Sequence, residues 1–229
     1  MDLLNYAENE LATLENMPMS PYTQDEKQWG DLVESSSFLP RVQLYGGTSN
    51  ACKEGKIPIG HFGIIKTKDE IDADLGVSFD CLPLSWRFKA MDVSNKEAII
   101  SVYNPKAEEF KRIVTQSEVK DSGCMYGIEF LVWIPAIAGY ATYYLNNASS
   151  RREAPNLKAL TQPSPRPATV KSKFIKGPKH SWHGPAIVAC STPMDTPDPA
   201  EAMEHAQRFA NPKESQIEKV EPVSGGRVQ

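Results

Sequence analysis

The chain has 229 residues, of which 40% are hydrophobic and 24% are charged. This composition is typical of a globular protein with a sizeable core and excludes collagen-like, coiled-coil and fully disordered chains. The 25 basic and 29 acidic side chains give a formal net charge of −4, which excludes a uniformly basic protein. We expect an acidic flexible arm over residues 1–36, a β-barrel domain over residues 37–191, and a C-terminal tail with a short helix over residues 192–229.

The first half of the expected β-barrel domain is rich in strand patterns. Residues 79–91 alternate so that Trp86 and Phe88 share one face and Arg87 and Lys89 share the other. This pattern favours rings in the core and cations in water, and the alternative is a second part of a binding face. Strands are expected at residues 38–45, 57–67, 79–91 and 98–103, a solvated turn at the acidic run 69–74, and a helix at residues 105–117 that begins after Asn104.

The second half of the domain contains a hairpin, a helix and a closing strand pair. The expected elements are strands at residues 127–135 and 139–145, a helix at 146–160 that Pro155 interrupts, and strands at 168–176 and 184–190 joined by a loop. A helix is also expected at residues 199–209. The order predicts a mostly β fold with one to three short helices, arranged as an oligonucleotide-binding-like (OB-like) Greek-key barrel, with a β-sandwich as the alternative.

Positive charge is concentrated in one stretch of the chain. Residues 151–190 carry eight basic side chains against Glu153 alone, whereas residues 1–34 carry eight acidic side chains against Lys27 alone. Residues 191–229 are again acidic, with seven acids and four bases. A basic segment between acidic ends indicates a polyanionic partner.

The basic segment also contains aromatic side chains, and this combination is what single-stranded nucleic acid requires. Cations follow the phosphate backbone, and ring faces stack on unpaired bases. Lys171 and Lys173 are two residues apart, so a strand would point both to one face. The alternative is a solvated lysine-rich hairpin that resists aggregation at a sheet edge. The candidate phosphate-binding residues are Arg151, Arg152, Lys171, Lys173, Lys176 and Lys179, and the candidate base-stacking residues are Trp182, Tyr143 and Tyr144.

Other chemistry has little support in the sequence. The four cysteines lie 29, 43 and 66 residues apart, which fits neither a zinc site nor a dense disulfide framework. His180 and His183 would point to opposite faces of a strand, and no phosphate-loop or nucleophile-elbow motif occurs. No apolar run is long enough to span a bilayer, and the acidic N-terminus lacks the basic region of a secretory signal. We therefore expect no cofactor, no metal, no membrane contact, and four reduced thiols in a cytoplasm.

Residues from about 38 to 191 resemble a group of uncharacterised bacteriophage proteins. The resemblance is carried by the motifs SSFLPR (36–41), DSGC (121–124), SRREA (150–154), KSKFIK (171–176) and SWHGP (181–185). The layout is similar to that of phage single-stranded-DNA-binding proteins, which combine an oligonucleotide-binding barrel with flexible acidic tails. The resemblance implies a non-enzymatic, sequence-nonspecific single-stranded-DNA-binding protein in the host cytoplasm, whose acidic arms recruit replication or recombination proteins. The alternatives are a phage structural or assembly protein and a metal-dependent enzyme that acts on nucleic acid.

Overall fold

The structure is a computed structural model that describes residues 39–67, 70–95, 98–178, 180–211 and 215–219. All of these residues belong to one compact unit, Ser36–Gln229. The acidic arm expected at residues 1–36 lies outside the described residues.

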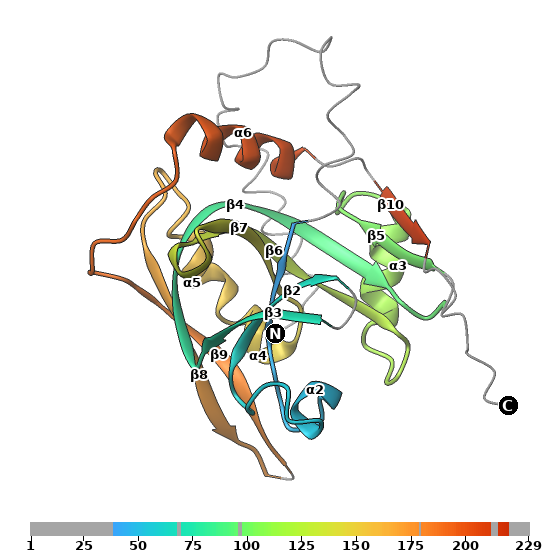
Figure 1. Cartoon of the computed structure of the whole chain (residues 1–229). Coiled ribbons are helices and arrows are strands. Elements are labelled where there is room, and N and C mark those ends of the chain that lie inside the picture. The colour runs from blue at the N-terminus through green and yellow to red at the C-terminus, as the bar shows by residue number, and fades with distance from the viewer. Residues whose placement is uncertain (1–38, 68–69, 96–97, 179, 212–214, 220–229) are drawn as a thin grey trace, which may run out of the picture. The chain divides into compact units, whose positions relative to one another are not determined.

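Ten strands form a mixed sheet in the described part of the chain (Figure 1). Eight of them follow the order β10-β5-β4-β6-β7-β1-β2-β3, and β8 joins this series by pairing with β4 on one side and β9 on the other. Neighbouring strands run antiparallel except β1 and β7, which run parallel. The strands are β1 (Arg41–Leu44), β2 (Phe62–Thr67), β3 (Glu70–Gly76), β4 (Ser78–Asp92), β5 (Ala98–Val102), β6 (Cys124–Ile134), β7 (Gly139–Leu145), β8 (Ala168–Lys176), β9 (Ser181–Ala189) and β10 (Ser215–Lys219).

Strand β4 connects the parts of this sheet. Its first residues, 78–81, pair with β8, while residues 82–92 pair with β6 and residues 90–92 also pair with β5. The register between β4 and β6 shifts between Pro83 and Ser85, where a proline interrupts the ladder. A single long strand therefore fixes where the β8–β9 hairpin begins relative to the rest of the sheet.

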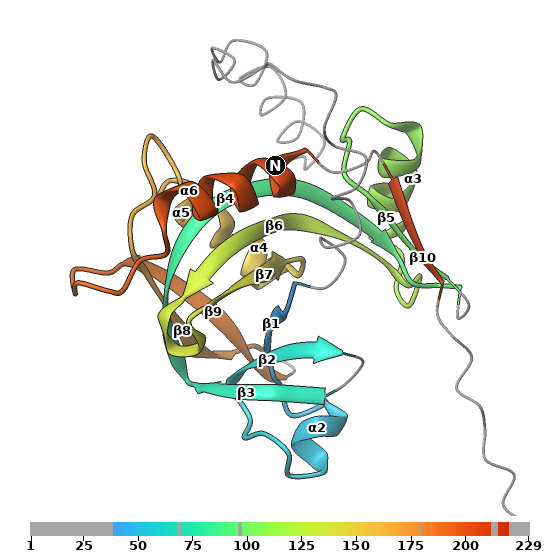
Figure 2. The same cartoon turned by 45° about the horizontal axis from the view of Figure 1, so that its top comes forward.

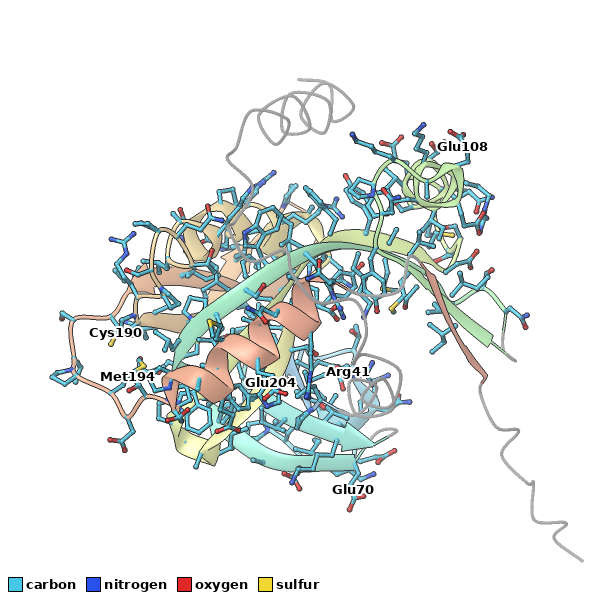
Figure 3. The ribbon with its side chains drawn as sticks, turned by 90° about the horizontal axis from the view of Figure 1, so that it is seen from above. Arg41, Glu70, Glu108, Cys190, Met194 and Glu204 are labelled. Atoms are coloured by element: carbon cyan, nitrogen blue, oxygen red, sulfur yellow. The ribbon has the colours of Figure 1, made fainter. Side chains whose placement is uncertain are left out.

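Short helices pack on both sides of the sheet. Strands β4, β6 and β7 arch side by side, with α6 over the outer side of the arch and α4 beneath its inner side (Figure 2). Figure 3 shows α6, which carries Glu204, running alongside β4. Among the described residues, no helix has the length and apolar character needed to cross a membrane. The helices are α2 (Asn50–Lys53), α3 (Glu108–Gln116), α4 (Ala148–Arg151), α5 (Ala154–Lys158), α6 (Pro199–Ala210) and the 3-10 turn η2 (Pro135–Ile137).

The main core lies inside the arch. Phe62, Phe79 and Tyr143 pack edge to face there, with ring centroids 5.0 to 6.4 Å apart. Leu157 of α5 closes this core, and a separate cluster around Phe110 of α3 packs against β4 and β5. The predicted mostly β fold is therefore confirmed, but the described residues contain five α-helices and a 3-10 turn rather than the one to three helices expected. These helices are short, and burial of their apolar side chains rather than their length stabilises them.

The structure also corrects several expected elements. The acidic run at residues 69–74 is not a solvated turn, because Glu70–Gly76 forms the edge strand β3. Helix α3 begins at Glu108 after Ala107, and the side chain of Asn104 instead accepts a hydrogen bond from the Lys106 N–H. The helix expected at 146–160 is divided into α4 and α5, with Pro155 in the first turn of α5. The helix expected at residues 199–209 is confirmed as α6, and both α6 and the later strand β10 contact the sheet.

Candidate nucleic-acid interface

The β8–β9 hairpin carries most of the candidate interface. Its base is held by β4, which pairs with β8 as far as Ser78↔Lys171. The two strands then continue together from Lys173↔Gly184 to Lys176↔Ser181. The Gly177 N–H donates to the His180 carbonyl at 3.0 Å and closes the turn. The hairpin tip reaches past the neighbouring strands in Figure 1.

The register assigns each hairpin side chain to a face. Directly opposed residues on paired strands point to the same side, and successive residues alternate. Lys171 and Lys173 therefore share one face, as predicted, and Trp182 lies on the same face because it pairs with Ile175. Phe174 lies on the other face opposite His183, with ring centroids 5.3 Å apart. The loop expected at residues 177–183 is shorter than predicted, so Trp182 belongs to β9 rather than to a loop.

These side chains are accessible and carry uncompensated positive charge. Lys171, Lys173 and Lys176 are exposed, and none has an ion pair with a described residue. Phe174 is 60% exposed and Trp182 is 38% exposed. The whole hairpin, residues 168–189, contains no aspartate or glutamate. Because these two rings are exposed, they contribute little to the core. Exposed rings beside lysines are suited to bind a partner that combines flat aromatic groups with negative charge.

Three of the predicted contact residues have other roles. Tyr143 is 3% exposed and is packed in the main core, so its ring has no free face for a base. Arg151 donates to the carbonyls of Asn146 and Tyr126 at 2.7 and 3.2 Å, and its guanidinium lies 4.3 Å from the Tyr126 ring centroid. These contacts fasten α4 to the sheet and leave Arg151 poorly placed to bind phosphate.

Tyr144 is also engaged within the protein. Its hydroxyl donates to the Lys89 carbonyl at 2.9 Å, and burial raises the pKa of this hydroxyl. The side chain lines a pocket of about 390 Å³ together with Arg41 and Pro185, the latter from β9. Tyr144 therefore lies near the base of the hairpin but not on its exposed faces.

Arg152 is the remaining predicted arginine, and it is exposed at the end of α4. This helix contacts β9, where a side chain on Gly184 would lie 3.3 Å from Ser149. Arg152 is thus carried by a helix that packs on the hairpin. Lys179 lies outside the described residues.

A second cluster of cations and aromatic rings lies under α6 and contains Arg87 and Lys89. The sequence analysis predicts that these two cations face water. Glu129 is 2% exposed and receives hydrogen bonds from Arg87 and Lys89 at 2.8 and 2.7 Å. Burial alone would raise the pKa of Glu129, but the charges and hydrogen bonds of Lys89 and Arg87 lower it. The prediction that these two cations face water is therefore wrong, although the prediction that they share a face is confirmed.

Helix α6 covers this cluster. The Arg87 guanidinium lies between the rings of Tyr103 and Phe209, 4.1 and 4.0 Å from their centroids, and donates to the Phe209 carbonyl at 3.0 Å. The His205 ring stacks on Tyr140 with centroids 4.1 Å apart. The outer face of β4, β6 and β7 is therefore occupied by the protein's own helix, whereas the lysines of the hairpin are exposed.

The potential metal ligands and the thiols of the described residues do not form a cluster. Within them, no group of three or more His, Cys, Asp or Glu side chains is placed to hold a metal ion. The four cysteines are free, with Cys81 buried and the other three half-buried. Burial raises the pKa of the Cys81 thiol, which makes it unreactive.

No family model, curated protein or solved structure matches this chain. The functional assignment therefore depends on the geometry and charge of the chain itself.

Proposed function

We propose that this protein binds single-stranded DNA without sequence preference, through the β8–β9 hairpin, and performs no catalysis. The observation that carries the proposal is the set of exposed lysines and exposed rings on one acid-free hairpin. On one face Lys171 and Lys173 contact phosphates and Trp182 stacks on a base, and on the other face Lys176 and Phe174 offer the same combination. Arg152 extends the phosphate path along α4.

The strand order supports an OB-like reading of the central sheet. If β5 and α3, which lie between β4 and β6 in the chain, are treated as an insertion, the remaining order is β4, β6, β7, then α4 and α5, then β8 and β9. The long first strand of this series pairs with both the second and the fourth strand. A helical segment lies between the third and fourth strands of this series, as in OB folds. In that fold, the loop between the last two strands is one of the regions that contact nucleic acid. The corresponding region in this protein is the tip of the β8–β9 hairpin.

A single strand on the face of Lys171 and Lys173 contacts these two lysines and Arg152, and these three cations set the expected salt dependence. Each phosphate contact with a single strand contributes about −0.7 to the slope of log K against log salt concentration, so three contacts give a slope of about −2. Fluorescence anisotropy of a labelled oligo-dT at two or more salt concentrations measures this slope. Absence of binding at low salt overturns the proposal, and salt-independent binding overturns its electrostatic mechanism.

A matched pair of double variants locates the site. K171A/K173A removes two hairpin charges, whereas K53A/K120A removes two exposed charges outside the hairpin. We expect the first variant to weaken binding by roughly tenfold or more at low salt and to flatten the salt slope by about 1.4. The second should retain nearly the full affinity. If both variants lose the same affinity for single-stranded DNA, the loss reflects the net charge of the protein, and the hairpin is not the binding site.

A further inference from the structure

The distal part of the β8–β9 hairpin is a ribbon of two strands with no third strand beside it in the described residues. Strand β4 leaves β8 after Lys171, and β9 pairs with β8 alone. Other described segments contact the ribbon as far as His183 and Gly184, which pair with Phe174 and Lys173, whereas the side chains of Lys173, Phe174, Lys176 and Trp182 stay exposed. A side chain on Gly60 would lie 2.9 Å from His183, and one on Gly184 would lie 3.3 Å from Ser149. Both faces of the ribbon are therefore open toward its tip.

Each of these faces carries a ring and a cation. Trp182 and Lys173 lie on one face, and Phe174 and Lys176 lie on the other, because Ile175↔Trp182 and Phe174↔His183 are successive pairs of the ladder. A surface that binds one strand needs this combination on one face only. A ring and a cation on both faces of the ribbon could therefore bind two DNA strands, one on each face.

Resting on the proposed function, we infer that the ribbon is a wedge that holds two unpaired DNA strands, one on each face, at the end of a duplex. The preferred substrate is then a fork with two single-stranded arms. Apolar side chains that separate base steps are a known way for proteins to open a duplex. The free energy gained when one base stacks on a protein ring is comparable with the free energy lost when one base-pair step opens. Two rings therefore compensate for the opening of about one or two base pairs.

The experiment compares the full chain on three labelled DNAs: a single strand, a blunt duplex, and a fork with two unpaired arms of the same length as the single strand. We expect the fork to bind at least about fivefold more tightly than the single strand, the lower limit for one additional stacked base. A 2-aminopurine at the first paired position of the fork should become more fluorescent as the base unstacks. The blunt duplex should bind most weakly.

Variants separate the wedge from simple strand binding. Phe174→Leu keeps an apolar side chain but removes the flat ring from one face. A single strand can still use the Trp182 face, so its affinity should fall by no more than about twofold, whereas the fork preference should be lost. Phe174→Tyr should restore that preference, and Val119→Ala, which alters another exposed apolar residue, should leave it unchanged.

The outcomes distinguish the two proposals. Equal affinity for fork and single strand, without a change in 2-aminopurine fluorescence, overturns the wedge and leaves single-strand binding intact. Failure to bind any of the DNAs overturns the proposed function itself. A fork preference that survives Phe174→Leu in a variant with unchanged thermal unfolding also refutes the two-face arrangement.

Discussion

Replacing Glu129 by glutamine should be among the most damaging single substitutions in this protein. Glutamine keeps the shape of the side chain but removes the negative charge that neutralises Arg87 and Lys89. The side chains of these cations are only 16% and 12% exposed, so water cannot replace the lost carboxylate. Breaking a buried ion pair by removing one partner costs about 3–5 kcal/mol. That is a large part of the roughly 5–15 kcal/mol by which a typical domain is stable.

Urea denaturation of the full chain measures the effect. With an m-value of about 2 kcal/mol per molar, a loss of about 4 kcal/mol lowers the midpoint by about 2 M urea. Glu108→Gln is the matched control, because Glu108 also forms an ion pair, with Lys111, but its side chain is 90% exposed. Pairs of this kind contribute at most about 0.5 kcal/mol, so the control midpoint should hardly move.

A second measurement tests whether the charged cluster also holds α6. Arg87 donates to the Phe209 carbonyl and stacks on the Phe209 ring, so disturbing the cluster should loosen the helix. Amide hydrogen exchange in α6 should be faster in Glu129→Gln than in Glu108→Gln. If Glu129→Gln unfolds within about 1 kcal/mol of the control, the buried carboxylate does not neutralise the two cations, and our account of the cluster is wrong.

Three further predictions concern other parts of the fold. Hydrogen bonds from Arg112 and Ser94 outweigh the effect of burial and lower the pKa of Asp92 to about 2. The contribution of Asp92 to stability is therefore complete above about pH 5 and is lost as pH falls toward 2. Asp92→Asn should make the urea midpoint depend less on pH across this range. Gly60→Ala should lower stability more than Gly55→Ala in thermal unfolding, since both glycines have positive φ but only at Gly60 would the new methyl meet another side chain. Asp198→Ala removes an N-cap that accepts from two backbone N–H groups of α6, so it should cost about 1 kcal/mol and accelerate amide exchange in that helix.

Strand β4 was predictable because its pattern is strictly local. Alternation over residues 79–91 specifies the strand and, from Ser85 onward, its two faces, and the observed strand spans Ser78–Asp92. The register shift between Pro83 and Ser85 exchanges the two faces before that point, which alternation alone does not show. Strand β3 was missed although Ile71, Ala73 and Leu75 alternate with acids, because the acidic content was taken as a sign of a turn. At a sheet edge, one face of a strand meets water, and such a strand tolerates charged residues on that face.

The environment of each face could not be derived in the same way. Local alternation places Arg87 and Lys89 together, but the helix that covers them begins more than 100 residues later, at Pro199. The same principle could have separated Tyr143 from Tyr144, because adjacent strand residues point to opposite faces and cannot both serve one surface. Lys171 and Lys173 were correctly predicted to share a face because only their spacing was needed.

The pairing of the start of β4 with a distant stretch of the chain has a consequence for biosynthesis. Residues 78–81 at the start of β4 find their partner only in residues 168–171, about 90 residues further along the chain. At a translation rate of about 5–20 residues per second, the beginning of this strand waits roughly 5 to 20 s after leaving the ribosome. During that interval its hydrogen-bonding edge is open to the wrong partner, so slower translation across residues 82–167 would prolong the period in which the nascent chain is most prone to aggregate.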